Sequence, residues 1–219
     1  MVVWLAAAAL GAPGKKAVEV PIDVGVGPAA NLLFGPVRDE QSVLGGIAFS
    51  AEAVLDHQLL KKFKKRIPAQ YRKQVLGMDE IRITHPLVPR TIWISPKVGD
   101  ATVEMYGVQL RPVGLGLPLL DGPVRLDIGV GLIASYFYLN GDALPGPTHF
   151  LRPGIDPGIE LEVPFSDTYL LSGGWTSQLY LPQPVGGSIL EFGPLDASIC
   201  HLGQAFVKVH LRFPKRIKP

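Results

Sequence analysis

The chain has 219 residues, the size of one domain, and 47% of its residues are hydrophobic while only 18% are charged. This composition excludes intrinsic disorder, which requires few apolar residues, and the single cysteine excludes a scaffold held by disulfides. The 25 glycines and 21 prolines argue against a helical bundle, and no apolar run is long enough for a membrane-spanning helix. A net charge of +2 gives no sign of nucleic-acid binding.

The N-terminal segment is typical of a secretory signal. Residues 2–10 form an apolar core of suitable length for a signal peptide, and Ala9 and Gly11 match the small residues that signal peptidase requires. We therefore predict that residues 1–12 are a signal peptide and that residues 13–219 form a single domain. No Lys or Arg precedes the core, so a buried strand or helix is the alternative for this segment.

Apolar and polar residues alternate through most of the remaining chain. From Val18 to Val26, valine or isoleucine fills each even position, and the odd positions hold Glu, Pro, Asp or Gly. A period of two is the pattern of a β-strand with one apolar face. The same pattern predicts eight strands, in segments 17–34, 42–55, 102–114, 123–139, 150–163, 168–181, 187–193 and 204–213.

Two features of the polar face favour a membrane barrel, in which that face fills the lumen, over a soluble sandwich, in which it meets water. The first is a set of glycines that would make room in a narrow interior: Gly25, Gly27, Gly107, Gly129, Gly131, Gly158 and Gly174. The second is a near balance of charge, which residues withdrawn from water require. The acids are Glu19, Asp23, Glu52, Asp127, Asp156, Glu160 and Glu162, and the bases are Arg111, Arg125, Arg152, Lys208 and Arg212.

Aromatic residues on the apolar face agree with this interpretation. Tyr136, Tyr138 and Phe213 lie toward the ends of their segments, where outer-membrane barrels carry girdles of aromatic side chains.

The signal-like start, the even number of strands and a last strand over residues 202–213 that ends in Phe213 resemble the small bacterial outer-membrane barrels of the OmpA and OmpX kind. The resemblance covers about residues 17–55 and 101–213. It implies an all-β, antiparallel, up-and-down membrane β-barrel of about eight strands in the outer membrane. In that group the last strand usually ends in an aromatic residue, so residues 214–219 depart from the pattern. The alternative location is the periplasm or the medium, for a soluble exported protein.

Residues 56–100 interrupt the alternation with a basic amphipathic helical insertion. Apolar residues recur there at helical spacing, at Leu55, Leu59, Leu60, Phe63 and Ile67, and a second helical stretch covers residues 71–76. Such a helix can lie on an anionic lipid surface or on an envelope protein. The predicted membrane or partner contacts are Lys61, Lys62, Phe63, Lys64, Lys65 and Arg66. The alternative is a cap that packs its apolar stripe on the protein and leaves the lysines solvated.

The same insertion affects the strand count and the orientation. Segments 81–84 and 91–95 could form a hairpin, which would give ten strands. If both chain ends are periplasmic, the connection after the second strand, and with it the insertion, is periplasmic too. Segments 36–42 and 165–167 are then short outer loops, whereas outer-membrane barrels normally have short periplasmic turns and long outer loops. The orientation therefore stays open at this point.

No catalytic motif is present: the sequence has no phosphate-binding glycine loop, nucleophile elbow or H-E-x-x-H pattern. We predict no catalytic residue, metal or cofactor. The polar faces supply a candidate lumen network, formed by Asp127, Arg125, Arg152, Glu160, Glu162, Lys208, His210 and Arg212. In this network we expect Glu160 and Glu162 to pair with Arg125 or Arg152, and His210 to be a hydrogen-bonded interior residue. A proton or anion site at His210 and a catalytic or cation-binding glutamate pair are the alternatives.

Three functions remain compatible with the sequence. The first is a non-enzymatic barrel with a filled lumen, a structural or interaction protein that contacts the lipid bilayer, and an envelope partner, through residues 56–100. The second is a lipid-modifying outer-membrane enzyme, and the third is a soluble exported β-protein that binds an apolar ligand.

Overall fold

The computed structural model describes residues 18–34, 43–96, 103–120, 122–141, 148–180 and 200–217. The predicted signal peptide over residues 1–12 and the predicted strand over residues 187–193 lie outside these ranges. Within them, no helix is long and apolar enough to cross a lipid bilayer.

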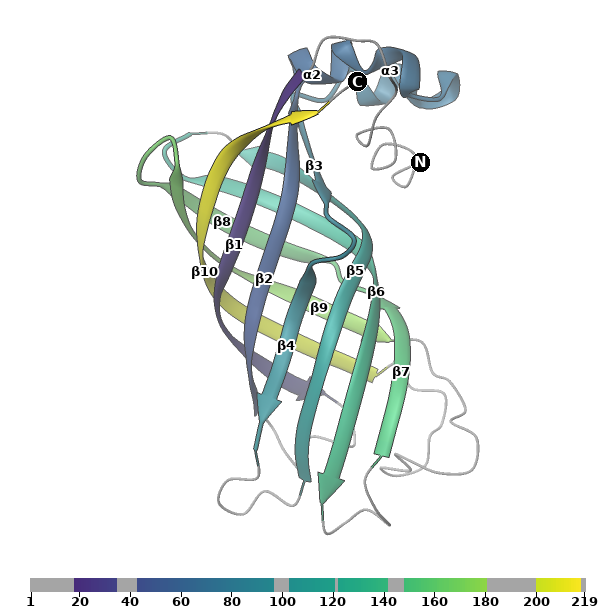
Figure 1. The fold of residues 1–219 in the computed structure, drawn as a ribbon, viewed down its shortest axis with the longest axis vertical. Helices are drawn as coiled ribbons and strands as arrows, with labels where there is room; N and C mark the ends of the chain where they lie inside the picture. The colour runs from purple at the N-terminus through teal and green to yellow at the C-terminus, as the bar shows by residue number, and fades with distance from the viewer. Residues whose placement is uncertain are drawn as a thin grey trace.

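The described chain forms one antiparallel sheet of ten strands (Figure 1). The strands are β1 (Val18–Phe34), β2 (Val43–Asp56), β3 (Glu80–Thr84), β4 (Pro89–Ser95), β5 (Val103–Leu120), β6 (Arg125–Gly141), β7 (Thr148–Ile155), β8 (Gly158–Pro164), β9 (Tyr169–Tyr180) and β10 (Cys200–Ile217). The sheet closes because β1 pairs with β10, from Val18 opposite Ile217 to Phe34 opposite His201.

The ten strands occupy eight positions around the barrel. β3 and β4 both pair with β2 on one side and with β5 on the other, so they are two halves of one interrupted strand. The predicted hairpin of segments 81–84 and 91–95 is therefore wrong, although both segments are strands. β7 and β8 likewise share one position between β6 and β9. The prediction of an antiparallel barrel of about eight strands is confirmed.

The predicted strand over residues 150–163 is broken where Asp156 and Pro157 separate β7 from β8. Proline has no backbone N–H to donate to a neighbouring strand. The break nevertheless stays tied to the sheet, because the Asp156 N–H donates to Gly131 O at 3.1 Å and the Ser177 N–H donates to Pro157 O at 2.8 Å. The wall is therefore continuous across this interruption.

The barrel is apolar outside and polar inside. On β1, Val24 and Val26 are 37% and 49% exposed, whereas Asp23 between Ile22 and Val24 is 2% exposed. The same order holds on β10, where Val207 and Val209 are exposed and Lys208 and His210 are buried. A polar side chain turned to the barrel axis and an apolar one turned outward is the arrangement of a membrane β-barrel.

A short helical segment follows β2, and we call residues 57–79 the helical cover. It contains α2 (His57–Lys62), two 3₁₀ turns, η2 (Lys64–Arg66) and η3 (Ala69–Tyr71), and α3 (Arg72–Val75). Asp56 ends β2 and caps α2, because its carboxylate accepts a hydrogen bond of 2.7 Å from the Leu59 N–H. The insertion predicted over residues 56–100 is thus shorter, since residues 80–84 and 89–95 belong to the barrel wall.

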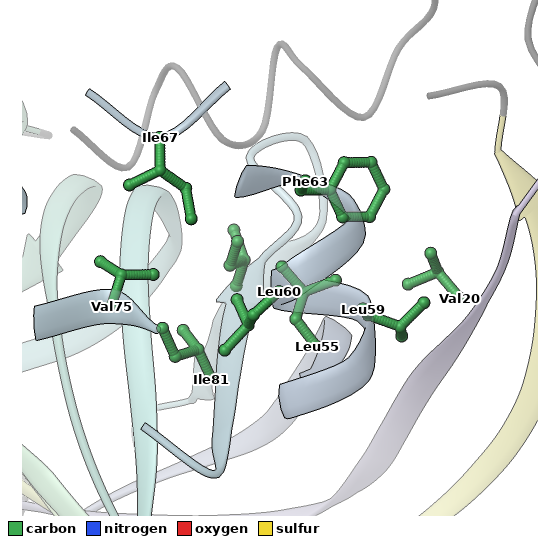
Figure 2. Packing of buried hydrophobic residues seen from close by; sticks show 9 residues of the cluster. Val20, Leu55, Leu59, Leu60, Phe63, Ile67, Val75 and Ile81 are labelled. Carbon is green, nitrogen blue, oxygen red and sulfur yellow. The ribbon is translucent and has the colours of Figure 1, made fainter. Parts of the chain in front are cut away.

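The helical cover packs on the outer wall of the barrel. Its apolar residues meet wall residues in one buried cluster (Figure 2), formed by Val20, Leu55, Leu59, Leu60, Phe63, Ile67, Val75, Ile81 and Ile83. Figure 1 shows the cover beside the ends of β1, β2 and β3, at the same end of the barrel as the end of β10. We call this end of the barrel, which carries the helical cover and the end of β10, the terminal end.

The strand connections differ in length between the two ends of the barrel. Apart from the helical cover, the strand connections at the terminal end are the short segments 121–124 and 165–168, whereas segment 181–199 joins β9 to β10 at the opposite end. Short turns are periplasmic in outer-membrane barrels, and longer loops are external. By this rule the terminal end corresponds to the periplasmic side of such barrels, and segment 165–167 lies at this end, together with the helical cover.

Candidate functional site

An ionic layer centred on Arg82 fills the lumen near the terminal end. Arg82 Nη1 lies 2.9 Å from Asp127 Oδ2, and Arg82 Nη2 donates to Glu162 Oε2 at 2.8 Å. Arg82 Nε also donates to Glu80 Oε1 at 3.1 Å. Gly116 faces Arg82 across the β3–β5 pair and leaves its side chain a path over β5 to the acids of β6 and β8. One buried guanidinium thus ties three carboxylates from three strands together.

Arg111 and Asp156 form a second buried pair. Arg111 Nε donates to Asp156 Oδ1 at 3.0 Å, and Arg111 Nη2 donates to the Asp156 carbonyl at 3.3 Å. Gly131 makes this possible, because a Cβ at that position would lie 2.2 Å from Arg111 Nε. The predicted role of the lumen glycines, to make room for large polar side chains, matches this contact.

Lys208 links the ionic layer to an aromatic residue. Its Nζ lies 2.8 Å from Glu160 Oε1 and 4.6 Å from the centre of the Phe206 ring, which faces the lumen. The Arg90 guanidinium lies 5.9 Å from the same ring. A cation over an aromatic face is stabilised further when it is buried, as Lys208 is.

An Asp–His–Ser relay lies beside Lys208. His210 Nδ1 lies 2.7 Å from Asp23 Oδ1, and His210 Nε2 lies 2.7 Å from Ser172 Oγ. Arg212 Nη2 donates to the other Asp23 oxygen at 2.9 Å. Gly25 gives the imidazole its space, since a Cβ there would lie 2.7 Å from His210 Cε1. The relay joins β1, β9 and β10 through side chains that the sequence separates widely.

Toward the opposite end most of the lumen side chains are neutral, although Arg152 is buried there opposite Ser135. Gln109 Nε2 donates to Tyr180 Oη at 3.1 Å, and Tyr180 Oη donates to Gln178 Oε1 at 2.9 Å. Phe137 stacks on Trp93 with ring centres 4.7 Å apart. Gln204 is the centre of a second hydrogen-bonded group. Its Nε2 donates to Asn31 Oδ1 and to Thr91 Oγ1, both at 2.9 Å.

These layers leave almost no free space. Where the structure describes the lumen, it holds a cavity of about 30 Å³, lined by Glu52, Arg82, Arg90, Arg111, Gly116, Asp127, Ile128, Gly129, Gly158, Ile159, Glu160, Thr176 and Phe206. That volume suits ordered water and is far below the several hundred Å³ of a pocket for a small organic ligand.

The structure places the predicted network residues in or beside the lumen. Asp127, Arg152, Glu162, Lys208 and His210 are buried, and Arg125, Glu160 and Arg212 are half-buried. Glu162 pairs with Arg82 and Glu160 pairs with Lys208, and Arg125, one of the predicted partners, lies opposite Glu162 in the β6–β8 pair. Glu19, expected inside, instead pairs with Arg216 at 3.1 Å on the surface.

Sequence reasoning missed Arg82 and Arg90 because they lie in the segment assigned to the helical insertion. The one available signal was the short alternation Glu80, Arg82, Thr84, which is the polar side of β3. The Asp–His–Ser relay had no local signal, since its three members come from three different strands.

The predicted contact residues of the helical cover divide into two groups. Lys61, Lys62, Lys64 and Lys65 are exposed. Phe63 is 5% exposed and packs inside the apolar cluster (Figure 2), so its predicted contact with a membrane or partner is wrong. The side chain of Arg66 is not among those the structure describes.

The residue types permit a metal site at one place only within the described chain. Ligand atoms of Asp23, Glu162 and His210 lie within 4.8 Å of one another. Arg212 and Arg82, however, already bind the two carboxylates. Two arginines at this position disfavour a cation, so these residues are better matched as ion-pair partners.

The outward surface assigns the protein to a membrane. Apolar side chains stay exposed around the barrel, among them Val26, Val130, Leu151, Ile159, Leu161, Tyr169 and Val209. Such a surface is stable in contact with lipid, and closed barrels are the form in which strands cross a membrane. The chain is therefore a membrane β-barrel protein, and its eight strand positions put it in the smallest size class of such barrels.

No family model matches this chain, and no curated protein matches it. Solved structures similar to it include Ail, the attachment invasion locus protein of Yersinia pestis, with 9% identity over 90% of this chain and 100% of that chain and a TM-score of 0.47. The Neisserial surface protein A has 9% identity over 91% and 100%, with a TM-score of 0.44. The N-terminal barrel domain of Pseudomonas aeruginosa OprF has 10% identity over 90% and 100%, with a TM-score of 0.43.

Proposed function

We propose that this protein is a non-enzymatic outer-membrane barrel with a closed lumen, and that it acts as a structural or interaction protein through its helical cover. The observation that carries this proposal is the packing of the lumen. Charged layers around Arg82 and Arg111 and hydrogen-bonded layers around Gln109 and Gln204 occupy the lumen, and the cavity described above holds only about 30 Å³.

The closed lumen predicts that the protein does not conduct ions. In a planar bilayer in concentrated KCl, the reconstituted barrel should give no resolved conductance steps, because an eight-stranded wall leaves an interior that side chains fill. A general porin measured in the same bilayers is the positive control. Steps that scale with the amount of folded barrel would refute the closed-lumen proposal.

The contact role is supported by the exposed basic side of the helical cover. A side-chain-filled barrel can act on its surroundings only through its surface. Of the described surface, the cover combines a firmly packed apolar side with a strongly basic exposed side.

One observation favours a second function, ester hydrolysis. Ser172, His210 and Asp23 are connected in the order of a serine hydrolase, with 2.7 Å between each pair of bonded atoms. Against it stands the packing, because Ser172 is 2% exposed and does not line the cavity described above. A nucleophile must reach the carbonyl that it attacks.

We therefore expect Ser172 to be unreactive. Incubation of the folded barrel with a fluorophosphonate probe should leave it unlabelled, with a secreted serine esterase labelled in parallel. Labelling that disappears in Ser172→Ala and in His210→Gln, while both variants keep the mobility of a folded barrel on a cold denaturing gel, would establish the hydrolase function instead.

A further inference from the structure

We propose that the helical cover binds the headgroups of anionic phospholipids in the leaflet on the terminal side of the membrane. This inference rests on the contact role proposed above and names its partner. Four observations carry it: which wall the cover packs on, what borders it, the charge that it exposes, and the aromatic residue beside that charge.

The cover lies on the lipid-facing wall and not over the mouth of the lumen. Arg82 points inward to Asp127 and Glu162, so its neighbours Ile81 and Ile83 point outward, and both belong to the cluster that the cover buries. An element that plugged the lumen would instead contact the inward side chains. The cover therefore occupies space that lipid would otherwise fill.

Exposed apolar residues border the cover along two strands. On β5, Leu115 and Leu117 pack against its cluster, while Leu119, closer to the terminal end, is 55% exposed. On β1, Ile22 packs against the cluster and Val24, farther from that end, is exposed. Exposed apolar surface thus adjoins the cover on both strands, so the cover borders the lipid-facing band and does not stand apart from it in the aqueous compartment.

The exposed side of the cover is basic. No Asp or Glu occurs between residues 57 and 78. The lysines with exposed side chains are Lys61, Lys62, Lys64, Lys65 and Lys73. Lys61 and Lys62 stand in the last turn of α2, where the helix dipole favours positive charge. Ammonium groups at the level of the headgroups attract phosphodiesters, and each contributes to binding at an anionic surface.

Tyr71 adds an interfacial residue to this surface. It is 38% exposed on η3, between the two basic stretches of the cover. Tyrosine is enriched at membrane interfaces because its ring is apolar and its hydroxyl is polar. A surface that binds a protein partner need not adjoin the lipid-facing wall, whereas a surface that binds lipid headgroups must adjoin it. The position of the cover therefore favours lipid.

The test is the selectivity of the reconstituted full-length barrel for spin-labelled phosphatidylglycerol over spin-labelled phosphatidylcholine. The test variant carries Lys61→Gln, Lys62→Gln, Lys64→Gln and Lys65→Gln together, and the control carries Arg at the same four positions, which keeps the charge. All four side chains are exposed and lie outside the cluster, so both variants should fold as the parent does.

We expect the parent and the Arg variant to prefer phosphatidylglycerol about tenfold, and the Gln variant to lose most of this preference. The preference should also weaken as salt is raised, because salt screens exposed charges. Equal selectivity in the parent and the Gln variant would overturn the inference. So would a photo-crosslinker at residue 64 that captures a specific envelope protein and no lipid, and that result would leave the contact role intact. Ion conductance, in contrast, would refute the closed-lumen proposal without bearing on lipid selectivity.

Discussion

Replacing Arg82 with Ala should destabilise the barrel by about 3–5 kcal/mol, since it leaves Glu162 and Asp127 buried without their cation. Two carboxylates that share one guanidinium in a closed lumen cannot recover their hydration without opening the wall. The measurement is urea-induced unfolding in detergent micelles, followed by tryptophan fluorescence and by the gel mobility of the folded form.

The matched control is Arg216→Ala, which removes the same side chain from an exposed ion pair. Arg216 and Glu19 have side chains that are 79% and 59% exposed, so water solvates whichever partner remains. This variant should change the free energy of unfolding by less than about 1 kcal/mol.

A double-mutant cycle tests the pair more closely. Glu162→Gln in the Arg82→Ala background should cost less than Glu162→Gln in the parent, because the second change then removes a charge that has lost its partner. Equal losses for Arg82→Ala and Arg216→Ala would show that Arg82 does not hold the lumen together.

Phe63→Ala should loosen the helical cover while the barrel stays folded. Truncating a buried Phe costs about 3–5 kcal/mol through lost transfer free energy and the cavity that is left. Phe63 packs among Leu59, Leu60 and the wall residue Val20, but the barrel strands pair with one another and not with it. The loss should therefore appear as local unfolding of residues 57–79. The equilibrium constant for this local unfolding should rise by about two orders of magnitude or more.

Limited trypsin digestion measures this opening. Cleavage after the lysines of the cover should accelerate strongly in Phe63→Ala, while the heat-modifiable gel shift of the barrel is retained. Gln58→Ala is the matched control, since Gln58 lies in the same helix with its side chain exposed. Unchanged digestion of Phe63→Ala, or loss of the folded barrel band, would contradict the packing of the cover as a separate layer on the wall.

The differences between prediction and structure lie in how strand segments are divided and joined. Alternation continues through Pro157 in the sequence and predicts one strand over residues 150–163, whereas the structure interrupts it at Asp156 and Pro157. Pairing with β6 and β9 shows that β7 and β8 still fill one strand position. Segments 81–84 and 91–95 look like two strands from the sequence, and a hairpin is the usual way to join neighbours. The shared pairing with β2 and β5 makes them one strand instead.

Charge pairing shows the same limit. Glu160 and Glu162 lie on one face of one strand, so the sequence identifies them as neighbours that need cations. Which cation each one meets depends on the strand order and on the stagger of the barrel. Arg82 reaches Glu162 from β3 because Gly116 clears its path over β5. A local pattern contains no information about such a contact.

The sequence by itself determined the strands: period-two alternation with charges and glycines on one face specifies strands with one apolar and one polar side, and it favoured a barrel over a soluble sandwich. Closure of the sheet through β1 and β10 in the tertiary structure decided between the two. The sequence also determined that residues 57–76 are basic and amphipathic. Only the tertiary structure decided that Phe63 faces the wall, that the cover lies on the lipid-facing side, and that Asp23, Ser172 and His210 meet. Alternation is a property of each strand alone, whereas these contacts depend on how distant strands are registered around a closed sheet.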